Sequence, residues 1–264
     1  MSPWRTVVIV LLAAAAVVGV GGVATGLWSV LWVENDRIQG MSELVPWEDA
    51  ITVPTVEARP TPTAGPDLLR RHSTSDPASP WVIVNKQRPI DAAYVPPDLV
   101  AVGDAQVRVA VEPDLRAMLD AAQADGVRII TSSGYRSYEG QAAARRAVEA
   151  RRGFAHAERY SARPGFSEHQ TGFALDVDSG SQPSCNYQTC FARTPEGVWL
   201  TEHAAEYGFV VRYTEQNSAI TGYAPEGWHL RWVGRELTAH LQANGIESLE
   251  EAFDVPGGPE YRED

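Results

Sequence analysis

The distribution of apolar and polar residues between positions 81 and 253 predicts short strands mixed with amphipathic helices. Largely apolar short runs predict strands at WVIVNK, VRIITSS, FVVRY and WHLRWV. Apolar residues at helical spacing predict helices over VEPDLRAMLDAAQADG, residues 138–152 and TPEGVWLTEHAAEYG. Because strands and helices do not alternate strictly, the pattern favours an α+β fold over a doubly wound parallel sheet. We expect a mainly antiparallel central sheet flanked by helices.

Capping residues support the ends of these predicted helices. Ser137 and Thr194 precede the second and third helices, and their hydroxyl groups can accept a hydrogen bond from a free amide of the first turn. Gly126 and Gly208 follow the first and third helices, as glycine often does where a helix stops. The capping signals therefore agree with the apolar pattern.

The first 34 residues contain a long apolar segment. Residues 7–33 include no charged residue over 27 positions, whereas a helix needs about 20 apolar residues to cross a bilayer. Arg5 precedes this segment and Glu34 follows it, which favours a cytoplasmic N-terminus and a single-pass protein of the cell membrane. A cleaved signal peptide, leading to secretion, is the alternative, although its apolar region would span only about 7–15 residues. Both interpretations place the rest of the chain outside the membrane.

Composition sets the limits of the folded part. Residues 35–80 include TVPTVEARPTPTAGP, whose prolines and threonines predict an extended extracytoplasmic linker. Residues 254–264 are predicted to form a disordered acidic tail, which leaves one domain over residues 81–253. The net charge of −12 argues against nucleic acid as a partner.

Two cysteines, Cys185 and Cys190, stand close together in CNYQTC. Outside the cytoplasm, the default expectation for such a pair is a disulfide that closes a small loop. A metal-binding C-x4-C pair is the alternative, and it is disfavoured because the chain has no second pair of thiols. The sequence therefore predicts a disulfide between these cysteines.

Four polar residues in the C-terminal half predict a catalytic metal centre. His169 and Asp176 lie in SEHQTGFALDVD, and Glu226 and His229 lie in EGWH. Strand alternation would turn Asp176 and His229 away from their apolar neighbours, so both could face the same point. Two imidazoles and one carboxylate suit zinc with an open fourth position. Glu226 then remains as a general base for a water molecule, which indicates a zinc hydrolase with one metal ion.

Several blocks of the chain resemble, in the same order, the VanY-type D-alanyl-D-alanine carboxypeptidases. Those enzymes are zinc peptidases that share a fold with VanX dipeptidases and the hedgehog amino-terminal domain. The blocks lie between residues 81 and 241, and they are VNKQRPI with YVPPDLV, SGYRSYEGQ, PGFSEHQTGFALDVD, WLTEHAAEYGFVVRY and GWHLRWVG. Together these motifs are specific, although each one alone is weak.

The resemblance implies roles for individual residues. His169, Asp176 and His229 would bind zinc, and Glu226 would be the base. Arg136 in SGYRS matches the arginine that would polarise the scissile carbonyl and stabilise the oxyanion. The matching positions that would line the substrate groove are Gln141, Ser167, Tyr213 and Trp228.

The activity implied by the resemblance is removal of the terminal D-alanine from peptidoglycan stem peptides ending in D-Ala-D-Ala. An endopeptidase or L,D-carboxypeptidase of the same fold is one alternative. A wall-binding module that retains zinc without turnover is another, and the presence of Glu226 and Arg136 argues against it. Two features depart from the family pattern. Gly227 stands where a proline is often seen, and SGSQPSCNYQTCFARTPEG is an unusual insertion that leaves the preferred substrate length open.

Overall fold

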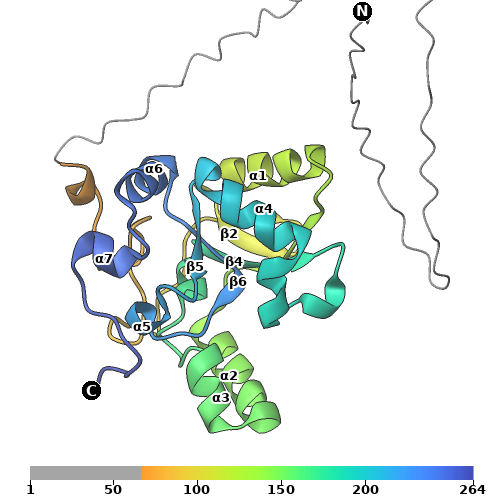
Figure 1. Ribbon diagram of the computed structural model, residues 1–264. Coiled ribbons are helices and arrows are strands. Elements are labelled where there is room, and N and C mark those ends of the chain that lie inside the picture. Colours follow the sequence, from red (N-terminus) through yellow and green to blue (C-terminus); the bar gives the residue numbers. More distant parts are fainter. Residues whose placement is uncertain (1–66, 264) are drawn as a thin grey trace, which may run out of the picture. The chain divides into compact units, whose positions relative to one another are not determined.

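The computed structural model describes residues 67–263 (Figure 1). The predicted membrane segment, residues 7–33, and most of the predicted linker lie outside the described residues. Within residues 67–263, no helix is both long enough and apolar enough to cross a bilayer.

A four-stranded sheet forms the centre of this part, with the strand order β3-β4-β6-β5. Each pair of neighbouring strands is antiparallel, which confirms the α+β expectation. A separate antiparallel hairpin, β1–β2, turns at Gly103 and Asp104, and Gly103 has a φ of 58°. The strands are β1 (Leu99–Val102), β2 (Ala105–Arg108), β3 (Ile129–Ser133), β4 (Ala174–Ser179), β5 (Phe209–Tyr213) and β6 (Glu226–Trp232).

Helices lie on opposite sides of the sheet. In the view of Figure 1, α1, α4 and α6 lie above the strands, and the α2–α3 pair lies below them. The α-helices are α1 (Glu112–Ala124), α2 (Tyr138–Arg152), α3 (Phe154–Tyr160), α4 (Pro195–His203), α5 (Ser218–Thr221), α6 (Arg235–Asn244) and α7 (Leu249–Phe253). Short 3-10 helices are η3 (Leu68–Arg70), η4 (Glu168–Thr171), η5 (Pro183–Cys185), η6 (Thr189–Arg193) and η7 (Ala204–Tyr207).

Alternation along β4 and β6 separates the core from the polar face of the sheet. Leu175, Val177 and Leu230 are fully buried in the main apolar core, together with side chains of α1. Each such side chain contributes roughly 1.5–3 kcal/mol through burial. Asp176 and His229 point away from this core because successive side chains of a strand face opposite ways. The packing of one face therefore fixes the orientation of the other.

The helix caps confirm the sequence signals. The Ser137 hydroxyl accepts a hydrogen bond from the Gly140 amide at 3.1 Å, and the Thr194 hydroxyl accepts one from Gly197 at 3.0 Å. The helix predicted over TPEGVWLTEHAAEYG is shorter than expected, because α4 ends at His203 and the chain continues as the 3-10 helix η7. The Thr238 hydroxyl donates to the Ala205 carbonyl at 2.6 Å, so that carbonyl has a partner outside a helical ladder.

The run WVIVNK was predicted to be a strand, and that prediction was wrong. Its residues are buried, but they make only an isolated bridge between Asn85 and Arg88. The backbone and side chains of the run bond to loops instead, since the Ile83 amide donates to the Thr74 carbonyl and the Trp81 indole donates to Val233. Burial explains the apolar composition without pairing in a sheet.

The folded region also extends beyond both predicted boundaries. Leu68 is buried in a second apolar cluster beside Trp81 and Leu237, before the expected start at residue 81. Residues 254–264 were predicted to be disordered, but within the described part of this tail Tyr261 packs its ring against Phe166 and under the Arg163 guanidinium. Aromatic and cation–π contacts of this kind give a polar tail enough partners to order it.

Candidate metal centre and active site

Three side chains converge at the polar face of β4 and β6. His169, Asp176 and His229 each place one possible metal-binding atom within 4.8 Å of the others. Asp176 and His229 are directly opposite each other in the β4–β6 pairing, so their side chains emerge side by side. His169 comes from η4, the short 3-10 helix before β4. All three residues are buried. Their side chains therefore converge at one buried point, as the sequence predicted.

The hydrogen bonds of the two imidazoles decide which nitrogen faces the centre. His169 Nδ1 lies 2.7 Å from the carbonyl oxygen of Gly134, a contact that requires a proton on Nδ1. His169 Nε2 then faces Asp176 Oδ2 at 3.2 Å. His229 is turned the other way, with Nδ1 3.0 Å from Asp176 Oδ1 and Nε2 facing the carboxylate of Glu168. The centre is therefore approached by Nε2 of one ring and Nδ1 of the other.

Electrostatics at this centre suit a cation. Burial alone would raise the pKa of Asp176, but His169 and His229 hold that pKa well below its usual range. Burial lowers the pKa of His169. Burial would also lower the pKa of His229, but hydrogen bonds to Asp176 and Glu168 outweigh it and raise the value to about 9. An ionised carboxylate between two nitrogen donors is the ligand set that zinc accepts, and these residues fit that ion.

A pocket of about 610 Å³ opens over the three ligands. Glu226, the first residue of β6, lines this pocket, and burial raises its pKa to about 8. Arg136 also lines it, just after the end of β3, with its guanidinium 3.7 Å from the Asp176 carboxylate. Two contacts fix the guanidinium, to Gln141 Oε1 at 2.9 Å and to Ser133 Oγ at 2.8 Å. The structure thus brings Glu226 and Arg136 to the predicted ligands.

The four residues expected to line the substrate groove all border this pocket, and they are Gln141, Ser167, Tyr213 and Trp228. Two of them also support other site residues. The Gln141 amide is engaged on both sides, because its oxygen accepts from Arg136 and its nitrogen donates to Ala162. The Tyr213 ring stacks on the His229 ring, with centroids 4.9 Å apart. Gln141 therefore holds Arg136 in place, and Tyr213 supports a metal ligand.

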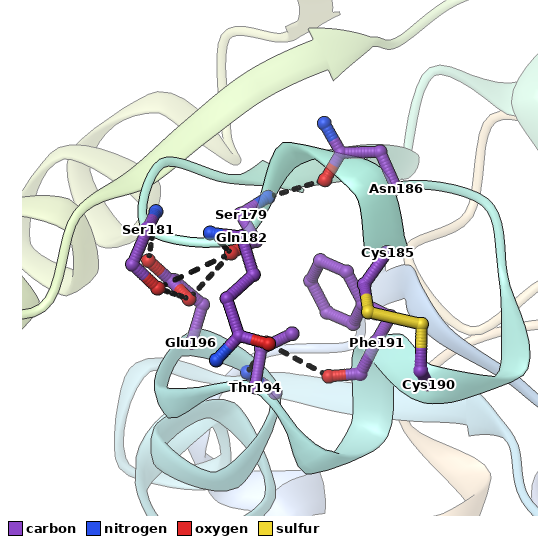
Figure 2. Close-up of a disulfide and its surroundings, with 10 residues drawn as sticks. Ser179, Ser181, Gln182, Cys185, Asn186, Cys190, Phe191, Thr194 and Glu196 are labelled. Carbon is purple, nitrogen blue, oxygen red and sulfur yellow. Dashed lines mark hydrogen bonds between the residues drawn. A yellow bond between two sulfur atoms is a disulfide. The ribbon is translucent and has the colours of Figure 1, made fainter. Parts of the chain in front are cut away.

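A loop closed by the predicted disulfide, the rim loop, borders the pocket through Tyr187, Gln188 and Thr189. Figure 2 shows the disulfide and its surroundings. Cys185 and Cys190 are joined by the bond drawn in yellow. At the base of the loop, the buried carboxylate of Glu196 accepts hydrogen bonds from the Ser179 hydroxyl at 2.7 Å and from Ser181. The Asn186 side chain accepts from the Ser179 amide at 2.8 Å. These contacts anchor the loop on both sides of the disulfide.

Tyr187, at the tip of this loop, lines the pocket and was not identified from the sequence. Its φ of 56° is rare for a residue with a side chain. Its hydroxyl hydrogen-bonds to Ser132, and its ring packs edge-on against Trp228. The sequence gives no sign that a tyrosine between these two cysteines adopts a positive φ, so the role of Tyr187 at the pocket could only be found from the structure.

The glycine that departs from the family pattern has a packing reason. A Cβ atom on Gly227 would come within 3.2–3.3 Å of Ala192, a residue of η6 just after the disulfide. Gly227 therefore lets η6 approach β6 closely, next to Glu226. The two departures from the family pattern are therefore linked, because Ala192 of the insertion packs directly against Gly227.

Comparison with known proteins agrees with this geometry. Residues 104–235 match the family model described as VanY, D-alanyl-D-alanine carboxypeptidase. A carboxypeptidase from Bacillus subtilis strain 168, described as putative and named YodJ, is 34% identical over 189 residues, covering 68% of each chain.

Solved structures give the same picture. The LdcB LD-carboxypeptidase superposes with a TM-score of 0.61 at 34% identity, covering 68% of this chain and 88% of that one. A mutant of the vancomycin-resistance D,D-pentapeptidase VanY, solved with Zn(II), gives a TM-score of 0.56 at 34% identity, covering 64% of this chain and 96% of that one. The chain therefore belongs to the VanY family of carboxypeptidases, and it is a peptidase.

Proposed function

We propose that this protein is a zinc-dependent D-alanyl-D-alanine carboxypeptidase that removes the terminal D-alanine from peptidoglycan stem peptides. The observation that carries the proposal is the convergence of His169, Asp176 and His229 in a pocket that also presents Glu226 and Arg136. The family description and the zinc-containing relative support the choice of reaction and metal.

The three convergent residues would hold one zinc ion through His169 Nε2, His229 Nδ1 and the Asp176 carboxylate. Zinc, when bound, supplies a Lewis acid that lowers the pKa of a water molecule to about 7 and polarises a carbonyl group. Three protein ligands leave one position open, as catalytic rather than structural sites do. The orientation of both rings is already fixed by their second nitrogens, which bond to Gly134 and Glu168.

Glu226 and Arg136 perform the proton transfer and the charge stabilisation. The Glu226 carboxylate accepts a proton from the attacking water and returns it to the nitrogen of the leaving D-alanine. Burial raises its pKa towards neutrality, where a carboxyl group can both accept and release a proton. The Arg136 guanidinium donates hydrogen bonds to the carbonyl oxygen as negative charge develops there. Gln141 and Ser133 hold that guanidinium in advance, so little reorganisation accompanies the reaction.

A second candidate is L,D-carboxypeptidase activity on stem tetrapeptides. The similarity to LdcB favours it, because that relative is described as an LD-carboxypeptidase. The two candidates share the metal centre and differ in the stereochemistry of the residue before the scissile bond. Defined peptides therefore distinguish them.

The test is mass spectrometry of a pentapeptide ending in D-Ala-D-Ala and of the matching tetrapeptide, each incubated with zinc-loaded protein. We expect loss of one alanine from the pentapeptide, abolished by chelation and restored by zinc. Cleavage of the tetrapeptide alone would select the second candidate. No cleavage of either peptide by zinc-loaded protein would refute both.

The proposed substrate implies a location outside the cytoplasm. The disulfide in the rim loop supports that location, because such bonds persist in oxidising compartments. We further propose that residues 7–33 anchor the chain in the cell membrane, with the catalytic domain on the outer side. Fractionation of cells that express the full-length chain tests this placement.

A further inference from the structure

A fully buried carboxylate lies directly behind the metal ligands. Glu168 precedes His169 in η4, and its side chain has no solvent exposure. Burial alone would raise the pKa of Glu168, but the positive charges of Arg212 and Arg231 hold it well below its usual range. A buried ionised carboxylate costs several kcal/mol unless its partners compensate it.

The two oxygens of this carboxylate have different partners. Oε1 accepts hydrogen bonds from Arg212 Nε at 2.9 Å and from Arg231 Nη1 at 3.1 Å. Oε2 faces His229 Nε2 at 3.4 Å. Because both guanidinium groups use Oε1, Oε2 is left for the imidazole. An ionised carboxylate oxygen only accepts hydrogen bonds, so the contacts of His229 with Asp176 and Glu168 each place a proton on the ring nitrogen that faces the carboxylate. The contact with Glu168 retains the Nε2 proton when a metal ion displaces the proton that Nδ1 shares with Asp176.

The arginines are themselves held in place from outside the site. Arg212 donates two hydrogen bonds to the Glu250 carboxylate of α7, at 2.6 and 2.9 Å. The amide of Asn85 donates to the same carboxylate at 2.8 Å. Arg231 donates to the backbone carbonyls of Pro80 and Trp232. The cluster contains two carboxylates and two guanidiniums, so its charges balance without His229.

We propose that Glu168 is the positioning residue for the metal ligand His229. By holding the Nε2 proton, it makes Nδ1, which faces Asp176 and the proposed metal position, the nitrogen that loses its proton to bind a metal ion. Arg212 and Glu250 fix Glu168 and so connect α7 to the metal centre. The inference rests on the proposed zinc site, and it concerns how this chain prepares one ligand of that site.

The competing explanation is that Glu168 only neutralises the two arginines. The structure provides a variant that separates the two roles. Glu168→Asp keeps the negative charge beside Arg212 and Arg231, but its shorter side chain withdraws from His229. Glu168→Gln keeps the shape, and its amide group would oppose the Nε2 proton, which favours the tautomer with a protonated Nδ1 that cannot bind metal.

Glu196→Gln is the matched control. Glu196 is also a fully buried glutamate, and it accepts hydrogen bonds from Ser179 and Ser181, without contact to a metal ligand. Its substitution therefore reproduces the loss of a buried carboxylate elsewhere in the same domain. Any effect shared by the Glu196 and Glu168 variants is structural.

The experiment measures zinc affinity by competition with a chelator, the visible spectrum of the cobalt-loaded protein, and unfolding of the metal-free protein. We expect both Glu168 variants to lose about 10–100-fold in zinc affinity, as is typical for partners of ligating histidines, with an altered cobalt spectrum. Glu196→Gln should retain wild-type affinity and spectrum.

Two results for the variants would overturn the proposal. One is wild-type affinity in Glu168→Asp, and another is an equal loss of affinity in Glu196→Gln. If Glu168→Gln does not fold, Glu168→Asp decides alone because it preserves the charge balance. Failure of the wild-type protein to bind zinc would instead refute the proposed function, and the inference with it, before any variant is compared.

Discussion

Replacement of Glu226 by glutamine should damage activity and stabilise the metal-free protein at the same time. The zinc-loaded variant should lose activity by about 100-fold or more, because the amide cannot accept the proton of the attacking water. Zinc affinity should be retained, since Glu226 is not among the three convergent ligands. The gain in stability follows from the electrostatics of the pocket.

The size of the stability effect follows from the pKa of this carboxyl group. Burial raises the pKa of Glu226 from the ordinary 4.5 to about 8. At about 1.4 kcal/mol for each unit by which the pKa rises, the free-energy cost of ionising Glu226 in the folded protein reaches roughly 5 kcal/mol at most. Glu226 is partly exposed to the pocket, and water there reduces the cost, so we expect about 1–3 kcal/mol.

The sign of the effect gives it a characteristic pH dependence. The folded pKa lies above the unfolded pKa, so the stability associated with the protonated carboxyl is complete below about pH 4.5 and lost as pH rises through about 8. Glutamine does not titrate. The stability of the variant relative to the wild type should therefore increase between about pH 4.5 and about pH 8. Each kcal/mol of this difference should raise the melting temperature by about 2–4 °C.

The assay is thermal unfolding of chelator-treated wild type and variant across this pH range, beside zinc-loaded kinetics. Glu202→Gln serves as control, because the Glu202 side chain on α4 is 65% exposed. That control should show no comparable pH-dependent gain. A stability difference between Glu226→Gln and wild type that stays constant with pH would refute the electrostatic reasoning, and near-normal activity of the variant would refute the assignment of the base.

Three further predictions concern the ligands, the arginine and the rim loop. His169→Ala should remove most of the bound zinc, measured by metal analysis after dialysis, and full zinc content would contradict the ligand assignment. Arg136→Lys should lower kcat more than it changes KM in steady-state kinetics on a D-Ala-D-Ala peptide, because the planar donor fork is lost and the charge is kept; a change in KM alone would make Arg136 a substrate anchor. Replacing Cys185 and Cys190 by serine should leave the domain folded and speed amide hydrogen exchange in the rim loop, and unchanged exchange there would show that the other loop anchors suffice.

The metal centre could be predicted from the sequence because strand alternation is a local property. In FALDVD and WHLRW, a period of two was enough to separate Asp176 and His229 from the core residues around them. Arg136 was placed at the end of a strand because it follows the apolar run RIIT. The fold class followed from the order of these elements, and the resemblance to a known family supplied the residues that spacing alone does not reveal.

The parts that were missed depend on contacts between distant segments. WVIVNK has the composition of a strand, but tertiary burial beside α6 and the loops satisfies it without a sheet partner. The β1–β2 hairpin was not identified, although the Gly103–Asp104 pair between two apolar runs is a recognisable turn signal. Glu168 gave no signal, because its importance lies in two arginines more than forty residues away in the sequence.

The direct pairing of Asp176 with His229 has a consequence for how this chain folds. A slip of one residue between β4 and β6 would move Asp176 opposite a core residue and turn one strand's apolar side chains towards the pocket. A mispaired sheet would then offer no three-ligand site, so zinc would bind only molecules in the correct register. Mass action would draw the population towards that pairing as zinc becomes available. The metal proposed for this site would thus also select, during folding, the strand alignment that creates the site.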